Sequence, residues 1–320
     1  MIKVSKLKEI ITNHKQIIIM PHKDTDLDAF GAALGLYFFS KTINKKTLII
    51  FEEKEPEHPI TKSLENLQKE NIAISYITKE EAISLTYNNA LLILVDFHLQ
   101  KLSPIPEIID QIKDKVIIDH HIISDDIVLA EQTYIDENAS STCEMITLLL
   151  QKENIEIPRY VATIILGGIS IDTNNFTMKT TYKTYSVASY LTKLGASSTE
   201  IKYLLKEDLS EYFTLQEILQ NIIIINKNYA ICTCDNKIYT KEFLAKIASI
   251  AITFENIEVA FGIGKITEEI IGISTRSIGN IPASTLMEKF GGGGHKTDAA
   301  SQVRDKTIEE VKEQIINLVQ

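Results

Sequence analysis

Imidazole and carboxylate side chains gather in four short segments of this sequence, each of which contains or directly follows an apolar run. The segments read PHKDTDLDAFGAA, LLILVDFH, VIIDHH and GGISIDTNNF. Mixed imidazole and carboxylate ligands suit Mn²⁺ or a similar borderline cation rather than thiolate-bound zinc. Two such cations would roughly cancel four aspartates and let a phosphate approach. The residues concerned are His22, Asp26, Asp28, Asp96, His98, Asp119, His120, His121 and Asp172.

Each segment taken alone also has a purely structural interpretation. Asp26 and Asp28 would suit a turn followed by a helix N-cap. An aspartate that ends a strand, as Asp96 does, is common. The adjacent pair His120 and His121 is rarer and would fill a core poorly. Five of the seven histidines lie in these segments or in the glycine-rich loop, so we predict a divalent metal site.

The glycine-rich loop FGGGGHKTDAAS, residues 290–301, is a candidate anion-binding element. Consecutive glycines let backbone N–H groups approach an anion closely, and His295 could add a donor or a stacking ring. A flexible linker is the alternative. A helical pattern at 283–290 and a strand-like segment after the loop favour an ordered structure. Upstream, Arg276 at a predicted strand end could clamp a phosphate.

The elements that would position these residues alternate between strands and helices in the first half of the chain. Such alternation predicts a doubly wound parallel sheet. Ligands of open α/β sheets bind at the carboxyl ends of the strands, and the histidine and aspartate segments fall at these ends or beside them. Strands are expected at 16–20, 46–51, 90–96 and 116–119, and helices at 28–42, 140–153, 159–172 and 183–194.

A smaller second α/β domain is expected in the last third of the chain. Strand patterns occur at 222–234, 257–262 and 269–275, and helical patterns at 240–252 and 307–319. Cys232 and Cys234 share one face of a strand, and two buried small hydrophobes are favoured over a metal or redox pair. The predicted boundaries are 1–195 for the metal-binding domain, 196–221 for a helical linker and 222–320 for the substrate-binding domain.

Composition narrows the class of partner. The net charge of −10 and the absence of a basic stripe argue against long nucleic acid, which needs cations along its backbone. Three cysteines in 320 residues suit a reducing compartment rather than a disulfide framework. We therefore expect a cytoplasmic protein with a small anionic ligand, and no membrane span or leader peptide.

The ordered set HxxxDxD, strand-end Asp, DHH, a fourth Asp and GGGGH resembles the DHH phosphoesterase family, with its C-terminal DHH-associated domain, over nearly the whole chain. The resemblance implies two Mn²⁺ ions between the domains, with Asp96 as the bridging ligand. It implies His121 and Asp96 as catalytic residues, with His121 facing the scissile phosphate. By this resemblance one metal would bind His22, Asp26 and Asp96, and the other would bind Asp28, Asp96, His120 and Asp172. The nucleotide would bind Arg276, Ser277, Gly293, Gly294 and His295.

Within the family, HKDTDLDAFGAA, YIDENASSTCEM, GISIDTNNFTMKT and KEDLSEY look like the catalytic portion of membrane-bound, GdpP-type cyclic di-AMP phosphodiesterases, here expected as a stand-alone soluble protein. This implies hydrolysis of cyclic di-AMP to linear pApA by two-metal activation of water, with onward cleavage to AMP left open. The alternative is an oligoribonuclease (nanoRNase) and pAp phosphatase, and a non-catalytic nucleotide sensor is more distant. Small nucleotides are the expected partners, and the family suggests a homodimer.

Overall fold

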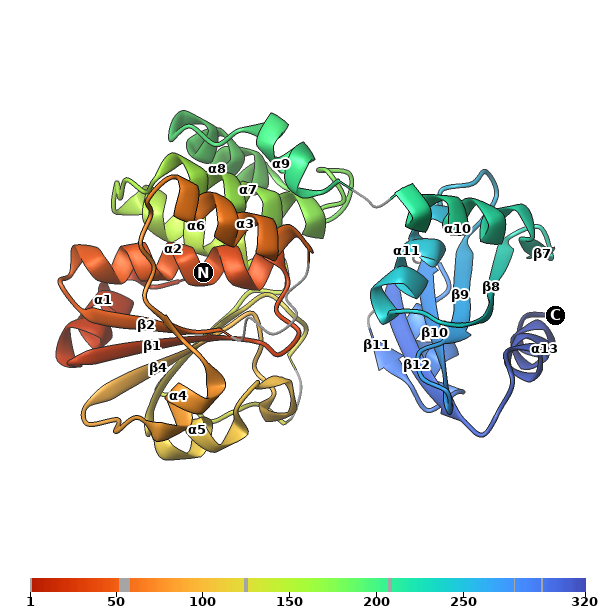
Figure 1. The fold of residues 1–320 in the computed structure, drawn as a ribbon, viewed down its shortest axis with the longest axis horizontal. Helices are drawn as coiled ribbons and strands as arrows, with labels where there is room; N and C mark the ends of the chain where they lie inside the picture. The colour runs from red at the N-terminus through yellow and green to blue at the C-terminus, as the bar shows by residue number, and fades with distance from the viewer. Residues whose placement is uncertain (1, 52–57, 124–125, 207–208, 279, 295) are drawn as a thin grey trace. The chain divides into compact units, whose positions relative to one another are not determined.

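The structure is a computed structural model that describes residues 2–51, 58–123, 126–206, 209–278, 280–294 and 296–320. The chain divides into two compact units, Met1–Lys206 and Glu207–Gln320, whose elements are drawn in Figure 1. Among the described helices, none combines the length and hydropathy that a membrane span requires. His295, a predicted substrate contact, lies outside the described residues.

The first unit is built on a six-stranded sheet in which every strand pairing is parallel. The strand order is β3-β2-β1-β4-β5-β6, and Figure 1 shows helices on both sides of the sheet. A parallel sheet covered on both faces requires continuous apolar strands, which explains the runs QIIIMP and ALLILV. The strands are β1 (Gln16–Pro21), β2 (Lys46–Ile50), β3 (Tyr76–Ile77), β4 (Ala90–Val95), β5 (Asp114–Asp119) and β6 (Gln132–Ile135).

Alternate residues of the central strands enter two different cores. Ile17 and Ile19 pack into one core, and Ile18 and Met20 pack into the other. The first core takes in α1 (Val4–Asn13), α2 (Leu27–Thr42), α3 (His58–Lys69), α6 (Thr142–Lys152), α7 (Arg159–Asp172), α8 (Tyr182–Lys193) and α9 (Ser198–Leu204). The second takes in α4 (Lys79–Ser84) and α5 (Pro106–Gln111).

The strand order reverses direction beside β1. The chain moves from β1 outward through β2 and β3 on one side, then returns to β4 and continues through β5 and β6 on the other. Helices that leave two neighbouring strands in opposite directions open a crevice at the carboxyl ends of those strands. His22 follows β1 and Asp96 follows β4, so both residues lie at this switch point.

The second unit holds a mixed six-stranded sheet of order β11-β12-β10-β9-β8-β7. β8 and β9 are parallel, and the other pairs are antiparallel. Together the two units confirm the predicted fold class. The elements are α10 (Leu209–Gln220), β7 (Ile223–Ile225), β8 (Tyr229–Ile238), α11 (Lys241–Ala251), β9 (Val259–Lys265), β10 (Ile270–Ser277), α12 (Ala283–Glu288), β11 (Gly293–Gly294), β12 (Asp298–Arg304) and α13 (Ile308–Val319).

The strand pattern at 222–234 covers two strands, and β8 confirms the strand expected to begin at Tyr229. The segment forms a hairpin of β7 and β8, because Asn226 and Lys227 take left-handed φ angles of 49° and 68°, as tight hairpin turns require. Cys232 and Cys234 are unpaired and buried, as predicted. The segment 196–221, predicted to be a linker, divides between the units: α9 packs on α7, and α10 packs on α11 and β8. Its boundaries stay a prediction.

Helices α2 and α7 pack in close contact because glycines lie between them. A Cβ atom built on Gly168 would lie 2.9 Å from the Asp28 Cα atom and 3.0 Å from the Leu27 carbonyl oxygen. Both neighbours are backbone atoms, so neither can move aside without shifting α2. Since α2 carries Asp28 in its first turn and Asp26 as its N-cap, this packing fixes where their carboxylates lie.

We predict that Gly168→Ala destabilises the first unit. The added methyl group forces α7 away from α2, and such overpacking costs about 1–3 kcal/mol. Denaturant unfolding followed by circular dichroism measures the change. The control is Ser186→Ala on the exposed side of α8, which should stay within about 0.5 kcal/mol of the parent. Equal stability of the Gly168→Ala protein and the parent would contradict the tight packing.

Candidate metal centre

Six candidate metal ligands meet at the carboxyl edge of the parallel sheet, although their positions in the sequence are far apart. They come from the segment after β1, the first turn of α2, the residue after β4, the residue after β5 and the end of α7. The topology accounts for this meeting, because the carboxyl ends of parallel strands share one edge. The six are His22, Asp26, Asp28, Asp96, His120 and Asp172.

The candidate donor atoms form three overlapping sets, each within 4.8 Å: His22, Asp26 and Asp96; Asp28, His120 and Asp172; and Asp96, His120 and His121. We call the first two sets the two ligand groups. In the first, the His22 Nε2 atom lies 3.7 Å from Asp26 Oδ2 and 3.6 Å from Asp96 Oδ2. In the second, which also holds Asp28, the His120 Nε2 atom lies 3.2 Å from Asp172 Oδ2. His120 Nε2 is also 3.5 Å from Asp96 Oδ1. The two oxygens of Asp96 therefore face different groups.

Asp96 is held in an unusual backbone conformation. Its φ angle is 66°, in the left-handed region that costs a non-glycine residue free energy and recurs at functional sites. Its N–H donates to the Ile118 carbonyl of β5 at 2.9 Å, which ties the end of β4 to the neighbouring strand. The strained residue is therefore the one between the two groups.

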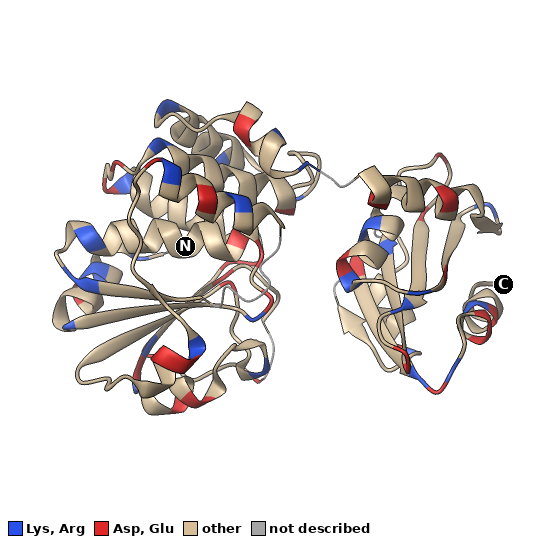
Figure 2. Ribbon diagram, viewed as in Figure 1, with Lys and Arg blue, Asp and Glu red and all other residues tan. Residues whose placement is uncertain are grey.

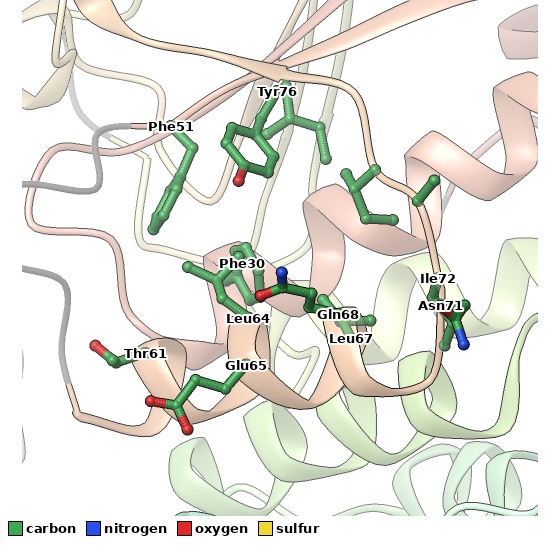
Figure 3. A pocket seen from close by; sticks show the side chains of 13 residues that line it. Phe30, Phe51, Thr61, Leu64, Glu65, Leu67, Gln68, Asn71, Ile72 and Tyr76 are labelled. Atoms are coloured by element: carbon green, nitrogen blue, oxygen red, sulfur yellow. The ribbon is translucent and has the colours of Figure 1, made fainter.

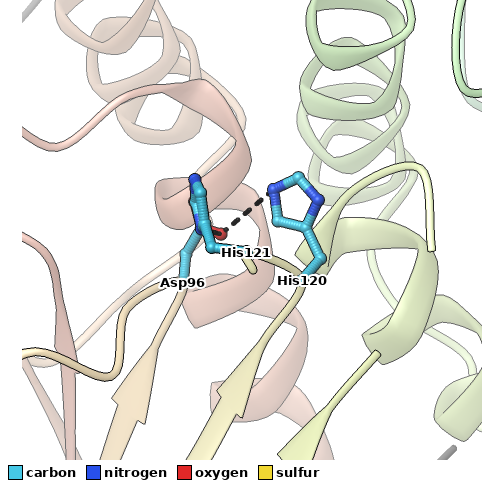
Figure 4. Close-up of side chains that lie close together, drawn as sticks. All are labelled: Asp96, His120 and His121. Carbon is cyan, nitrogen blue, oxygen red and sulfur yellow. Dashed lines mark ion pairs between the residues drawn. The ribbon is translucent and has the colours of Figure 1, made fainter. Parts of the chain in front are cut away.

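His121 lies beside the two groups and is the most exposed of the histidines in this cluster, with 41% of its side chain accessible. Its Nδ1 atom is 3.6 Å from Asp96 Oδ1, its ring centroid is 4.5 Å from that of His120, and Figure 4 draws the three side chains together. Its Nδ1 and backbone N–H bind Asp119 Oδ1 at 2.8 Å and 3.1 Å. The ring is thus held in one orientation.

Asp119 holds the His121 ring and is not among the predicted ligands. Its Oδ2 atom contacts Nδ1 of the buried His98 at 2.5 Å. Burial raises the pKa of Asp119, but hydrogen bonds from His121 and His98 outweigh burial and hold that pKa well below its ordinary value. Asp119 is therefore an anion that positions two imidazoles. The motif DHH indicated that these residues belong to the site, but it did not show that its first residue, Asp119, positions two histidines.

The N-terminus of α6 binds Asp28. The Thr142 N–H donates to Asp28 Oδ2 at 2.7 Å, and the Cys143 N–H donates to Asp28 Oδ1 at 2.9 Å. A carboxylate at a helix N-terminus satisfies orphan N–H groups and interacts favourably with the helix dipole. The Thr142 hydroxyl donates to Asp96 Oδ1 at 2.7 Å. Sequence reasoning missed Thr142, because a helix-start pattern such as SSTCE does not show which side chains its N–H groups meet.

The electrostatics of the cluster fit a divalent cation site. Burial, together with the nearby Asp172 and Asp96, raises the pKa of Asp28 well above its ordinary value, and burial also raises the pKa of Asp172. Burial lowers the pKa of His22, but its bonds to Asp26 and Asp96 overcome this and bring it to about 11. Without metal, the cluster compensates its negative charge by taking up protons. The mixed nitrogen and oxygen donor set also suits Mn²⁺-like ions.

Some of the substrate contacts predicted for the second unit lie around one cavity, and others do not. Arg276, Gly293 and Gly294 line one cavity of about 400 Å³, and the Arg276 Nε atom is 3.0 Å from Asp298 Oδ1. The glycines form β11, paired with β12, so this part of the loop is ordered. Ser277 is buried and its hydroxyl donates to the Ile281 carbonyl at 2.5 Å, so it faces away from the group around the cavity.

A larger cavity in the first unit is separate from this chemistry. It has a volume of about 710 Å³ and lies between α2, α3 and the strands β2 and β3. Figure 3 shows Phe51 and Tyr76 on one side of it and Leu64 and Gln68 of α3 on the other. None of the six candidate metal ligands lines it. The size of a cavity therefore does not identify the reactive site of this chain.

Comparisons with known proteins agree with the division into two units. The DHH family, N-terminal domain, matches residues 16–169, and the DHHA1 domain matches residues 226–320. The chain is 30% identical over 318 residues to the cyclic-di-AMP phosphodiesterase PdeA of Listeria monocytogenes. It is also 30% identical over 316 residues to the cyclic-di-AMP phosphodiesterase GdpP of Bacillus subtilis. These alignments cover 98% and 97% of this chain but only 48% of each relative.

More distant proteins resemble this chain in sequence or in structure. The bifunctional oligoribonuclease and PAP phosphatase NrnA of Thermus thermophilus is 24% identical over 95% of this chain and 89% of its own length. An exopolyphosphatase-related protein from Bacteroides fragilis superimposes with a TM-score of 0.80 at 22% identity, over 98% of this chain and 95% of that one. Exonuclease RecJ bound to manganese reaches 0.54 at 12% identity, over 99% and 93%.

We predict that Mn²⁺ stabilises the first unit and that Asp96→Asn removes most of this stabilisation. A ligand present at about 100 times its Kd adds about 2.7 kcal/mol to the free energy of unfolding. The substitution removes the negative charge that both ligand groups share, so the affinity for Mn²⁺ should fall in both. Denaturant unfolding with and without MnCl₂ measures the effect.

The control for this experiment is Asp114→Asn, which makes the same chemical change at the start of β5, at the other edge of the sheet from the cluster. The Asp114 carboxylate contacts His14 there. This variant should keep the full Mn²⁺ stabilisation. If Mn²⁺ stabilises Asp96→Asn as much as the parent protein, Asp96 is not a metal ligand.

Proposed function

This chain belongs to the DHH family, and we propose that it is a Mn²⁺-dependent phosphodiesterase that hydrolyses cyclic di-AMP to linear pApA. The observation that carries the proposal is the pair of ligand groups at the switch point of the parallel sheet, with Asp96 lying 3.6 Å from His22 of one group and 3.5 Å from His120 of the other. The likeness of almost the whole chain to two cyclic-di-AMP phosphodiesterases supports the choice of substrate. The chain spans about half the length of these relatives.

The proposed ligand sets place His22, Asp26 and Asp96 around one ion and Asp28, Asp96, His120 and Asp172 around the other. Divalent ions held there would lower the pKa of water and neutralise charge on the phosphoryl oxygens. Asp119 holds His121 by its Nδ1 atom, so His121 would contact the scissile phosphate through Nε2.

The second unit supplies a candidate anion site for the nucleotide. Arg276 is a planar donor suited to phosphate oxygens, and it lines one cavity with Gly293 and Gly294. Burial lowers the pKa of Arg276, while Asp298 opposes that change. The ion pair with Asp298 is made through the Nε atom, so a nucleotide phosphate could approach the other guanidinium nitrogens.

The alternative function is an oligoribonuclease and pAp phosphatase that uses the same ligands, as the likeness to NrnA suggests. A non-catalytic sensor is disfavoured, because both ligand groups keep all the residues that a hydrolase of this family would need. The net charge of −10 supports a small nucleotide over a long nucleic acid, and Figure 2 shows basic and acidic residues interspersed within each unit. We also propose a cytoplasmic location, where three unpaired cysteines would stay reduced. A homodimer stays a prediction.

Product analysis tests the substrate. Purified protein with MnCl₂ would receive cyclic di-AMP, pApA, a short RNA and pAp in separate reactions at equal concentration. We expect cyclic di-AMP to be converted to pApA and the reaction to stop when a chelator is added. If the cyclic dinucleotide survives while pApA, RNA or pAp is consumed, the oligoribonuclease alternative holds instead.

The role of Arg276 is tested separately by Arg276→Ala. Loss of a hydrogen bond to a charged group costs about 1.5–3 kcal/mol, so kcat/KM for cyclic di-AMP should fall about 10- to 100-fold, mostly through KM. Arg304→Ala is the matched control, since Arg304 is exposed at the far end of β12 and paired with Ile270 rather than with the cavity. An unchanged KM in Arg276→Ala would exclude Arg276 from nucleotide binding.

A further inference from the structure

The first residue of α6 touches a carboxylate from each of the two ligand groups. Resting on the proposed function, we infer that Thr142 is a positioning residue whose hydroxyl fixes Asp96 in the orientation that bridges the two metal ions. The side chain is fully buried, and its Oγ1 atom lies 2.7 Å from Asp96 Oδ1. Its own N–H binds Asp28 Oδ2 at 2.7 Å.

The direction of the hydroxyl bond follows from the chemistry of its partner. An ionised carboxylate only accepts hydrogen bonds, so the Thr142 hydroxyl donates. Each carboxylate oxygen has two lone-pair positions, and the hydroxyl takes one position on Asp96 Oδ1. The same oxygen lies 3.5 Å from the His120 Nε2 atom and 3.6 Å from the His121 Nδ1 atom. Oδ2 stays on the side of His22, at 3.6 Å.

The bond matters because the carboxylate of an aspartate rotates easily. The terminal torsion of Asp has a broad distribution of angles, and a rotation of a quarter turn would move both oxygens of Asp96 away from their groups. The backbone of Asp96 is held by the N–H bond to Ile118, but that bond does not fix the side-chain torsion. The Thr142 hydroxyl fixes it directly.

Thr142 can hold Asp96 only if the start of α6 is itself rigid. Ser141 caps the helix by accepting the Glu144 N–H at 3.0 Å. The buried Glu144 carboxylate accepts hydroxyl bonds from Ser140 at 2.7 Å and from Thr184 of α8 at 2.6 Å. The Cys143 N–H adds a second bond to Asp28. These bonds anchor the helix start to α2 and α8, so Thr142 cannot follow Asp96 if the carboxylate turns.

Three variants separate the hydroxyl from the shape of the side chain. Thr142→Val keeps the branched shape and removes the donor, whereas Thr142→Ser keeps the donor and removes a methyl group. The matched control is Thr147→Val in the same helix. Thr147 is equally buried, but its hydroxyl donates to the Cys143 carbonyl at 2.7 Å and not to a carboxylate. All three proteins would first be shown to be folded by circular dichroism.

Electron paramagnetic resonance with two equivalents of Mn²⁺ per chain gives a readout independent of activity. Two Mn²⁺ ions that share a carboxylate bridge give an exchange-coupled spectrum, whereas separate ions give the six-line spectrum of isolated Mn²⁺. We expect coupling in the parent, Thr147→Val and Thr142→Ser proteins, and its loss in Thr142→Val. The kcat of Thr142→Val for cyclic di-AMP should fall about 10- to 100-fold, as for other partners of metal ligands, with less change in KM.

The outcomes distinguish this inference from the proposed function. Coupled spectra in both the parent and Thr142→Val would overturn the role of Thr142 and leave the metal centre in place. A parent protein that never shows a coupled pair would instead overturn the proposed two-metal centre. If Thr142→Val does not fold, Thr142→Ala removes the same donor with less volume at the helix start, and coupling retained in that variant would also overturn the inference.

Discussion

Four aspartate side chains converge at one end of a parallel sheet, and their mutual repulsion is the constraint that the rest of the site must satisfy. Asp28 and Asp96 are buried, so solvent screens them poorly. The raised pKa of Asp28, caused by burial and by Asp172 and Asp96, is the direct consequence. A site of this charge is stable only with compensating cations, protons or N–H donors, and this chain provides for each of them.

The fold meets the constraint with elements that also set the geometry. The reversal of strand order beside β1 places the ends of β1 and β4 together, so His22 and Asp96 meet without a long loop. The start of α6 contributes N–H groups to Asp28 and a hydroxyl to Asp96. Burial lowers the pKa of His120, but Asp172, Asp96 and Asp28 raise it to about 10. His120 therefore adds positive charge beside these carboxylates. Two divalent ions would replace these protons, which links metal binding to proton release.

Much of the first unit follows from the sequence, because buried parallel strands read as continuous apolar runs and end in polar residues. The positions of His22 and Asp96 directly after β1 and β4 could be predicted in this way. The role of Thr142 could not, since it depends on α6 meeting Asp28 and Asp96, which lie 114 and 46 positions away along the chain. The strand pattern at 222–234 does not show the break between β7 and β8, because Asn226 and Lys227 form a tight turn without glycine.

The proposed chemistry depends on a pair of metal ions that share Asp96. A crystal structure of the protein grown with Mn²⁺, with anomalous diffraction recorded at the manganese edge, would locate these ions. We expect two anomalous peaks on opposite sides of the Asp96 carboxylate. One would lie beside His22 and Asp26, and the other beside Asp28, His120 and Asp172. A single peak, or two peaks neither of which contacts Asp96, would contradict the shared carboxylate bridge.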